Sequence, residues 1–427
     1  MALCRIVFVL VLFGLVSAKL KQYDGFTLYE VVVENTEQEM VFNKLESELN
    51  LDVWSRATPE QSGRILVSKS EKTEFENELS TAGIKHTIVV ENMEELIELE
   101  RKQLSEADEM SAGINMYGIA IDTMHTYDQV NSFLEQLANN YTSVNLLSQG
   151  TTFEGRPINY IRISSSNFTD YNKPVVFIQS LIQAREWISL PVALHAINKL
   201  VTNITDSDLV NTIDWIILPI ANPDGYHYSS TISRLWTKNR RAVGSECVGV
   251  NINRNFDINF GAHSSSNICS DNYHGPDTES EIETRSIRDI LILHQGRIKL
   301  FLNLQSFGSH ILYGFGTGGL PGNALILNFL GVQMTSIINA FNSSKDNDYT
   351  VGNIAAVVAA ESGNVMDYAT LVRNVPYSYT IKLPSYGNSG SVSDNGYIVD
   401  PSYFTQAAEE TWEAIKYCAR FVRDNPF

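Results

Sequence analysis

The sequence has few cysteines, a deficit of positive charge and only one long apolar run. Its 427 residues include four Cys, and 31 Lys and Arg stand against 49 Asp and Glu, which gives a formal net charge of −18. A charge of this sign argues against nucleic acid or an anionic membrane as the main partner. No stretch after the first 18 residues is a comparably long apolar run, so we expect no transmembrane segment.

The single long apolar run lies within residues 1–18. One Arg precedes it and small residues follow it at Ser17 and Ala18, which is the pattern of a secretory signal peptide. The run is too short to span a membrane. We therefore expect cleavage after about Ala18, a secreted, extracellular protein and an oxidising environment.

Three cysteines remain beyond this segment. Cys247 and Cys269 flank a polar, Ser-rich loop, so we expect a disulfide between them. Cys418 lies in a helical pattern and is predicted to be a buried free thiol. Candidate glycosylation sites, usable where the chain is exposed, stand at Asn140, Asn167, Asn203 and Asn342.

Residues 19–111 predict a small α+β unit. Short strand patterns alternate there with amphipathic helix patterns, and an acidic connector helix follows. The predicted strands are 27–34, 64–68 and 85–91, the helices 37–49 and 71–83, and the connector 92–110.

Residues 112–427 predict a large α/β domain, with a doubly wound mixed sheet and helices on both faces. Several strand-like runs are apolar on both faces, as in a sheet that helices cover on both sides. The predicted strands are 157–164, 174–181, 212–221, 298–307 and 377–383. The predicted helices are 127–141, 189–201, 279–294, 324–341 and 406–422.

The motifs of this sequence, and the order in which they occur, resemble those of a known protein family. Along the chain come EGRPINYIRIS, QAREWIS, ANPDGYHYS, RLWTKNRR, CVGVNINRNFD, YHGPDTESEIET, LNLQSFGSHILYGFG and YSYTIKL. Together they resemble the digestive zinc carboxypeptidases of the A/B type over nearly the whole chain. The resemblance implies that 19–111 is a propiece and 112–427 the carboxypeptidase-like domain. It also implies one zinc held by two His and one Glu, which lowers the pKa of bound water to about 7.

The residues at the metal positions depart from the family pattern. Gln183 and Glu186 stand where the family has H-x-x-E, and Gln305 stands at the His of the third ligand. A carboxamide is a poor zinc ligand beside imidazole, and Asn251 replaces the Asp that orients the first His. No His in the sequence is followed by Glu at the spacing of an H-x-x-E motif. We therefore expect no cofactor, although the family uses zinc.

The other catalytic positions also differ. Lys382 stands at the position of the general base, a Glu in the family, and a protonated Lys has no acceptor lone pair. Thr237 replaces the Arg that assists the transition state, and counting back from Asp367 places Ala359 at the capping Tyr.

Several substrate-binding positions match the family. Asn253 and Arg254 correspond to the pair that grips a C-terminal carboxylate, which suits a planar Arg. The pair either serves the fold alone or still binds carboxylates. Arg185 matches a further substrate-side Arg, and Met366 matches the bottom of the specificity pocket, where it would favour an apolar C-terminal side chain.

Two hypotheses follow from charge. Glu186 and Lys382 sum to zero without a metal, so we expect the Lys382 ammonium to fill the emptied site and pair with Glu186. No Lys or Arg occurs between Lys102 and Arg156. We therefore expect that trypsin-like cleavage does not remove the propiece, which stays attached as a lid.

The sequence thus predicts a secreted carboxypeptidase-like pseudoenzyme that binds peptide or protein C-termini. One alternative is an active metallocarboxypeptidase with a non-standard zinc site, which cleaves apolar C-terminal residues. Another is a luminal structural or decoy protein.

Overall fold

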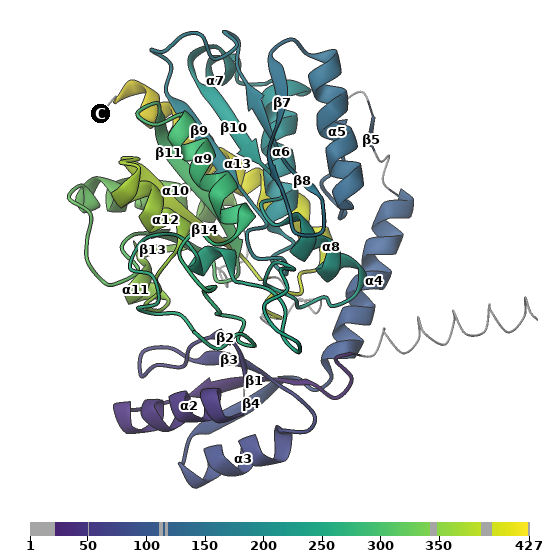
Figure 1. Cartoon of the computed structure of the whole chain (residues 1–427), viewed down its shortest axis with the longest axis vertical. Coiled ribbons are helices and arrows are strands. Elements are labelled where there is room, and N and C mark those ends of the chain that lie inside the picture. Colours follow the sequence, from purple (N-terminus) through teal and green to yellow (C-terminus); the bar gives the residue numbers. More distant parts are fainter. Residues whose placement is uncertain are drawn as a thin grey trace, which may run out of the picture.

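The computed structural model describes residues 22–49, 51–110, 114–115, 118–341, 348–385 and 395–425. The predicted signal peptide, the boundary after residue 111 and the sequon at Asn342 lie outside these residues. Within them a small domain sits at one end of a larger one, with β2 turned toward it, and α4 runs from the small domain along the side of the large one (Figure 1).

The small domain is a four-stranded antiparallel sheet with two helices. The strand order is β2-β3-β1-β4. The elements are β1 (Thr27–Val32), α2 (Thr36–Glu48), β2 (Asp52–Ser55), β3 (Gly63–Val67), α3 (Lys72–Thr81), β4 (Lys85–Val90) and the connector α4 (Met93–Met110). The predicted strands and helices are confirmed, and β2 was missed.

Both faces of the central strand β1 are buried, which explains why it is apolar at successive positions. Tyr29 and Val31 pack with α2 and α3. Leu28 points the other way, because successive side chains alternate across a strand. It joins a cluster that includes Leu235 and Phe307 of the large domain. The small domain is therefore bound to the large one through its own sheet.

The large domain contains an eight-stranded mixed sheet, which confirms the predicted fold class. The strand order is β13-β12-β14-β11-β9-β10-β8-β7. The strands are β7 (Val144–Thr151), β8 (Pro157–Ile163), β9 (Val175–Gln179), β10 (Asp214–Leu218), β11 (Ile298–Ser306), β12 (His310–Tyr313), β13 (Thr350–Asn353) and β14 (Tyr377–Leu383). A separate pair is formed by β5 (Ile114–Asn115) and β6 (Gly118–Ile119).

Helices cover both faces of the sheet. The alternation along β9 shows this, because Val176 and Ile178 belong to one core and Val175 and Phe177 to another. The first core includes α5, α6, α7, α10 and α13, and the second includes α9 and α12. The helices are α5 (Tyr127–Asn140), α6 (Ser189–Val201), α7 (Ser207–Thr212), α8 (Pro223–Thr231), α9 (Ile282–Leu293), α10 (Ala324–Phe341), α11 (Ile354–Val357), α12 (Val365–Asp367) and α13 (Phe404–Asp424).

Helix α10 is long and apolar enough to cross a membrane by length and composition alone. Its side chains Leu327, Leu330, Met334 and Ile338 belong to the main core, so one face covers the sheet.

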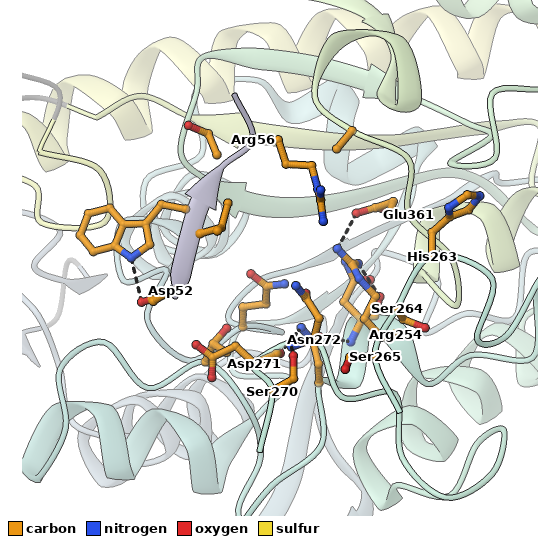
Figure 2. A pocket seen from close by; sticks show the side chains of 18 of the residues that line it. Asp52, Arg56, Arg254, His263, Ser264, Ser265, Ser270, Asp271, Asn272 and Glu361 are labelled. Atoms are coloured by element: carbon orange, nitrogen blue, oxygen red, sulfur yellow. Dashed lines mark hydrogen bonds and ion pairs between the residues drawn. The ribbon is translucent and has the colours of Figure 1, made fainter. Parts of the chain in front are cut away.

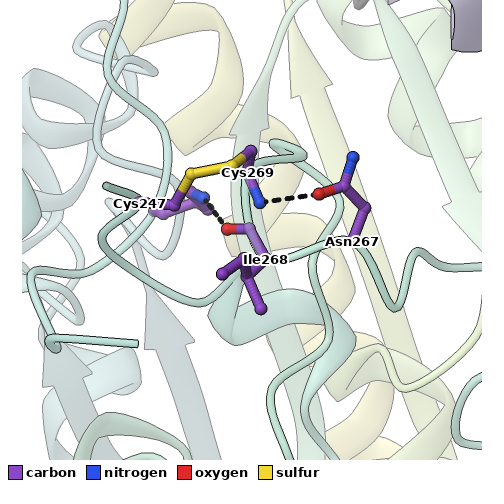
Figure 3. Close-up of a disulfide and its surroundings, with 5 residues drawn as sticks. Cys247, Asn267, Ile268 and Cys269 are labelled. Atoms are coloured by element: carbon purple, nitrogen blue, oxygen red, sulfur yellow. Dashed lines mark hydrogen bonds between the residues drawn. A yellow bond between two sulfur atoms is a disulfide. The ribbon is translucent and has the colours of Figure 1, made fainter. Parts of the chain in front are cut away.

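The predicted disulfide is confirmed. Cys247 and Cys269 are bonded, with their Cα atoms 5.1 Å apart, and Asn267 Oδ1 accepts a hydrogen bond from the Cys269 amide (Figure 3). Cys418 is a buried free thiol, as predicted. The sequon residues Asn140, Asn167 and Asn203 are exposed, and their glycosylation stays a prediction.

Candidate functional site

The site lies at the carboxyl ends of the parallel strands β9, β11 and β14. Gln305 and Lys382 are partners in the register of β11 and β14, one residue before each strand ends. The segment that follows β9 contributes Gln183 and Arg185. Ligands of open α/β sheets bind outside this end of the strands.

A cavity of about 690 Å³ occupies this position, and both domains line it. The small domain contributes β2 with its neighbours, and the large domain contributes the loop 263–272 and the segment 358–361 (Figure 2). The disulfide fastens one wall, since Cys269 belongs to that loop. The predicted site residues that line the cavity are Gln183, Arg185, Thr237, Asn253, Arg254, Gln305, Ala359 and Lys382.

Two predicted site residues do not line the cavity. Glu186 is buried, and neither carboxylate oxygen has a hydrogen-bond partner among the described residues. Met366 is buried in a small cluster with Leu312 and Ile354. The specificity role predicted for Met366 stays a prediction.

The donor atoms at the metal positions do not fit a zinc ion. Gln183 and Gln305 offer neutral carboxamides, and Glu186 is the single carboxylate of the three positions. No group of three His, Cys, Asp or Glu side chains suited to a metal occurs among the described residues. Zinc in proteins is held by thiolate, imidazole and carboxylate ligands. These three side chains therefore do not provide the ligand set that zinc chemistry requires.

The predicted ion pair between Lys382 and Glu186 was wrong. Among the ion pairs of the described chain, none joins these two side chains. They still influence each other, because burial raises the pKa of Glu186 to about 8 and the Lys382 charge opposes this rise. Burial likewise lowers the pKa of Lys382, and the charge of Glu186 opposes that shift. Lys382 lines the cavity and does not form an ion pair with Glu186.

The Arg254 side chain already has a carboxylate partner, which the sequence did not reveal. Its Nη2 lies 2.9 Å from Glu361 Oε2, and its Nη1 donates to the Asn253 carbonyl oxygen at 2.8 Å. Asn253 accepts a hydrogen bond from the Val365 amide through Oδ1. Figure 2 shows Arg254 and Glu361 facing each other in the cavity. A ligand carboxylate at this Arg must therefore displace or share Glu361.

The small domain closes the opposite side with its own ion pairs. Arg185 Nη1 donates to both Asp52 oxygens, at 3.0 and 2.9 Å. Arg234 donates to both Glu100 oxygens, at 2.6 and 2.8 Å, and both side chains are 2% exposed. Trp54 meets Phe307 and Tyr397 edge to face.

Asp52 was also missed by sequence reasoning. It begins the four-residue strand β2 and pairs with Arg185 of the large domain. Its charge also contributes, after burial, to raising the pKa of Asp271 on the facing loop to about 6.

The fold is that of a carboxypeptidase-like domain preceded by an activation-type domain. The zinc carboxypeptidase family matches residues 130–414, and the carboxypeptidase activation peptide matches residues 29–100. The chain belongs to the zinc carboxypeptidase family.

Relatives match over nearly the full length. Carboxypeptidase B of Helicoverpa zea is 38% identical over 98% of this chain and 99% of its own, and carboxypeptidase A2 of Mus musculus is 31% identical over 97% and 98%. The crystal structure of carboxypeptidase A from Helicoverpa armigera is 45% identical with a TM-score of 0.91, covering 95% of this chain and 99% of its own.

Proposed function

We propose that this protein is a secreted, metal-free member of its family that binds the C-termini of peptides or proteins and does not cleave them. The proposal is based on the residues that line the cavity. Asn253 and Arg254 lie there together with Lys382 and Thr237, which the resemblance puts at the positions of the family's general base and transition-state Arg. Its described lining offers groups suited to a carboxylate, and the resemblance identifies no intact hydrolytic set among these residues.

The attached small domain belongs to this proposal. Arg234 and Arg185 are buried against its carboxylates, and removal of the propiece would take Glu100 from Arg234 and leave Arg185 with only the longer contact to Asp271, at 3.9 Å. Protein sequencing of the secreted material should therefore find an N-terminus close to residue 19. An N-terminus near Ser111 would contradict retention of the propiece.

Zinc content is the first test. Mass spectrometry of protein purified without chelators should give a zinc-to-protein ratio near zero. A ratio near one, with chelator-sensitive hydrolysis of C-terminal residues, would instead support the active metallocarboxypeptidase with a non-standard site. The family membership favours that alternative.

Binding is the second test. A peptide with a free C-terminus should bind, whereas the same peptide with a C-terminal amide should not, because Arg254 needs a carboxylate. Arg254→Ala should abolish the difference. If neither peptide binds and neither is cleaved, the luminal structural or decoy role is supported instead.

A further inference from the structure

Lys382 carries an amine that lines the cavity and has no partner among the described residues. It lies on β14, is half-buried and lines the cavity. Its Nζ has neither a hydrogen bond nor an ion pair within the described part of the chain. Lys238 provides a contrast, because it is buried and its Nζ donates to the Ile268 carbonyl oxygen at 3.1 Å.

Other polar atoms around Lys382 are also unsatisfied. Both oxygens of Glu186, Oγ1 of Thr237 and Oγ of Ser306 are buried without hydrogen-bond partners among the described residues. Ser306 ends β11 and pairs in register with Leu383, the neighbour of Lys382. Buried polar groups are normally hydrogen-bonded, so unsatisfied ones call for an explanation such as water or a ligand.

The surroundings of Lys382 lower the pKa of its amine below the ordinary value of a lysine. Burial lowers the pKa of Lys382, while Glu186 and Glu361 raise it and Arg254 and Arg185 lower it further. His310 faces it from β12, and burial followed by the charge of Lys382 lowers the pKa of that His to about 4. A desolvated lysine of this kind is a nucleophile toward carbonyl compounds.

We propose that Lys382 captures an aldehyde or ketone in the cavity as an imine. The amine nitrogen attacks the carbonyl carbon, and one proton moves from nitrogen to oxygen to give a carbinolamine. Loss of the hydroxyl group as water then forms the C=N bond. Water in the cavity supplies the proton that the departing hydroxyl group needs and takes up the proton that the nitrogen releases, so the net reaction is amine plus carbonyl to imine plus water.

The ligand class follows from the neighbouring residues. A carbonyl compound that also carries a carboxylate, such as a 2-oxo acid, could place that carboxylate at Arg254. This refinement rests on the proposed function of Arg254, whereas the capture by Lys382 does not.

Reductive trapping tests the inference. The full chain is incubated at neutral pH with glyoxylate and cyanoborohydride, which converts an imine into a stable secondary amine, and the modified lysine is found by peptide mass spectrometry. We expect one carboxymethyl group per chain, at Lys382. Lys382→Arg should lose this label, and Lys238→Met, the matched control, should keep it.

The outcomes separate the two claims. Label spread over exposed lysines such as Lys44, with no excess at Lys382, would overturn the inference, and wild-type mapping decides this even if Lys382→Arg fails to fold. Propanal is the neutral probe. Equal labelling of Lys382 by propanal and glyoxylate, unchanged in Arg254→Ala, would keep the imine and reject the carboxylate site.

Discussion

The contact between the two domains, here called the rim, and the buried groups in and beside the cavity wall, here called the floor, differ in how their polar side chains are paired. At the rim, where the two domains meet, Arg185 and Arg234 each donate two hydrogen bonds to a carboxylate of the small domain. On the floor, Glu186 and Thr237 have no hydrogen-bond partner among the described residues.

This difference in pairing indicates that the rim attaches the small domain, while the floor has groups that can bind water or a ligand. A buried ion pair that loses one partner is strongly destabilised, so the rim resists separation of the domains. An unsatisfied polar group in contact with a cavity costs less once water or a ligand reaches it. The ion pairs of the rim therefore attach the small domain to the large one, whereas the unsatisfied groups of the floor can still gain a partner from water or a ligand.

Breaking the rim should have the largest effect. Glu100→Ala leaves the Arg234 guanidinium buried without its carboxylate, which should lower the free energy of unfolding by about 3–5 kcal/mol. Urea denaturation measures this loss. Glu106→Ala is the matched control on the same helix, because Glu106 pairs with Lys102 at 3.7 Å in solvent, and it should cost less than about 1 kcal/mol. Equal losses in the two variants would contradict the special role of the rim.

The floor should respond to pH. The pKa of Glu186 is raised to about 8 in the folded state, chiefly by burial. Its contribution to stability is therefore fully present below the unfolded pKa and is lost as the pH rises through about 8. Glu186→Gln should match the wild type at pH 5 and exceed its stability at pH 8 or above, by on the order of 4 kcal/mol.

Thermal or urea unfolding at the two pH values checks this prediction. Glu281→Gln offers a comparison, because the Glu281 carboxylate has partners in Arg241 and Asn239 and its replacement should destabilise the protein at both pH values. A stability difference for Glu186→Gln that is the same at pH 5 and pH 8 would contradict a neutral Glu186.

The smallest effect is expected at Glu361. Glu361→Gln removes the internal carboxylate from Arg254, so a peptide with a free C-terminus should bind up to about tenfold more tightly, or about 1.4 kcal/mol. Titration calorimetry would measure the change, with the amidated peptide as the control ligand. Unchanged affinity would mean that Glu361 does not compete for Arg254.

Much of the fold could be predicted, because apolar runs mark its central strands and the sequence motifs follow one another in a recognisable order. Val175–Gln179 and Ile298–Ser306 are buried on both faces and are readily identified as central strands. The strands β7, β12 and β13 were missed, since they are polar, short or only partly buried. Their assignment depends on pairing with distant segments, which local pattern does not encode.

The site was predicted position by position but not contact by contact. The cavity brings together Gln183, Thr237, Asn253 and Lys382, each of which a motif had marked. Glu361 carries no motif and lies far along the chain from Arg254, so their ion pair required the fold. The predicted contact between Lys382 and Glu186 was wrong for the same reason. Two opposite charges balance whatever the distance between them, so the charge count could not show whether the side chains touch.

The apolar cluster between the domains has a consequence for unfolding. Leu28, Trp54 and Met93 of the small domain share one core with Leu235, Phe307 and Tyr397 of the large domain. Both halves of this cluster are apolar, so separating the domains would expose apolar surface on each of them. The two domains should therefore melt in one cooperative transition, and a calorimetric trace of the intact chain should show a single peak.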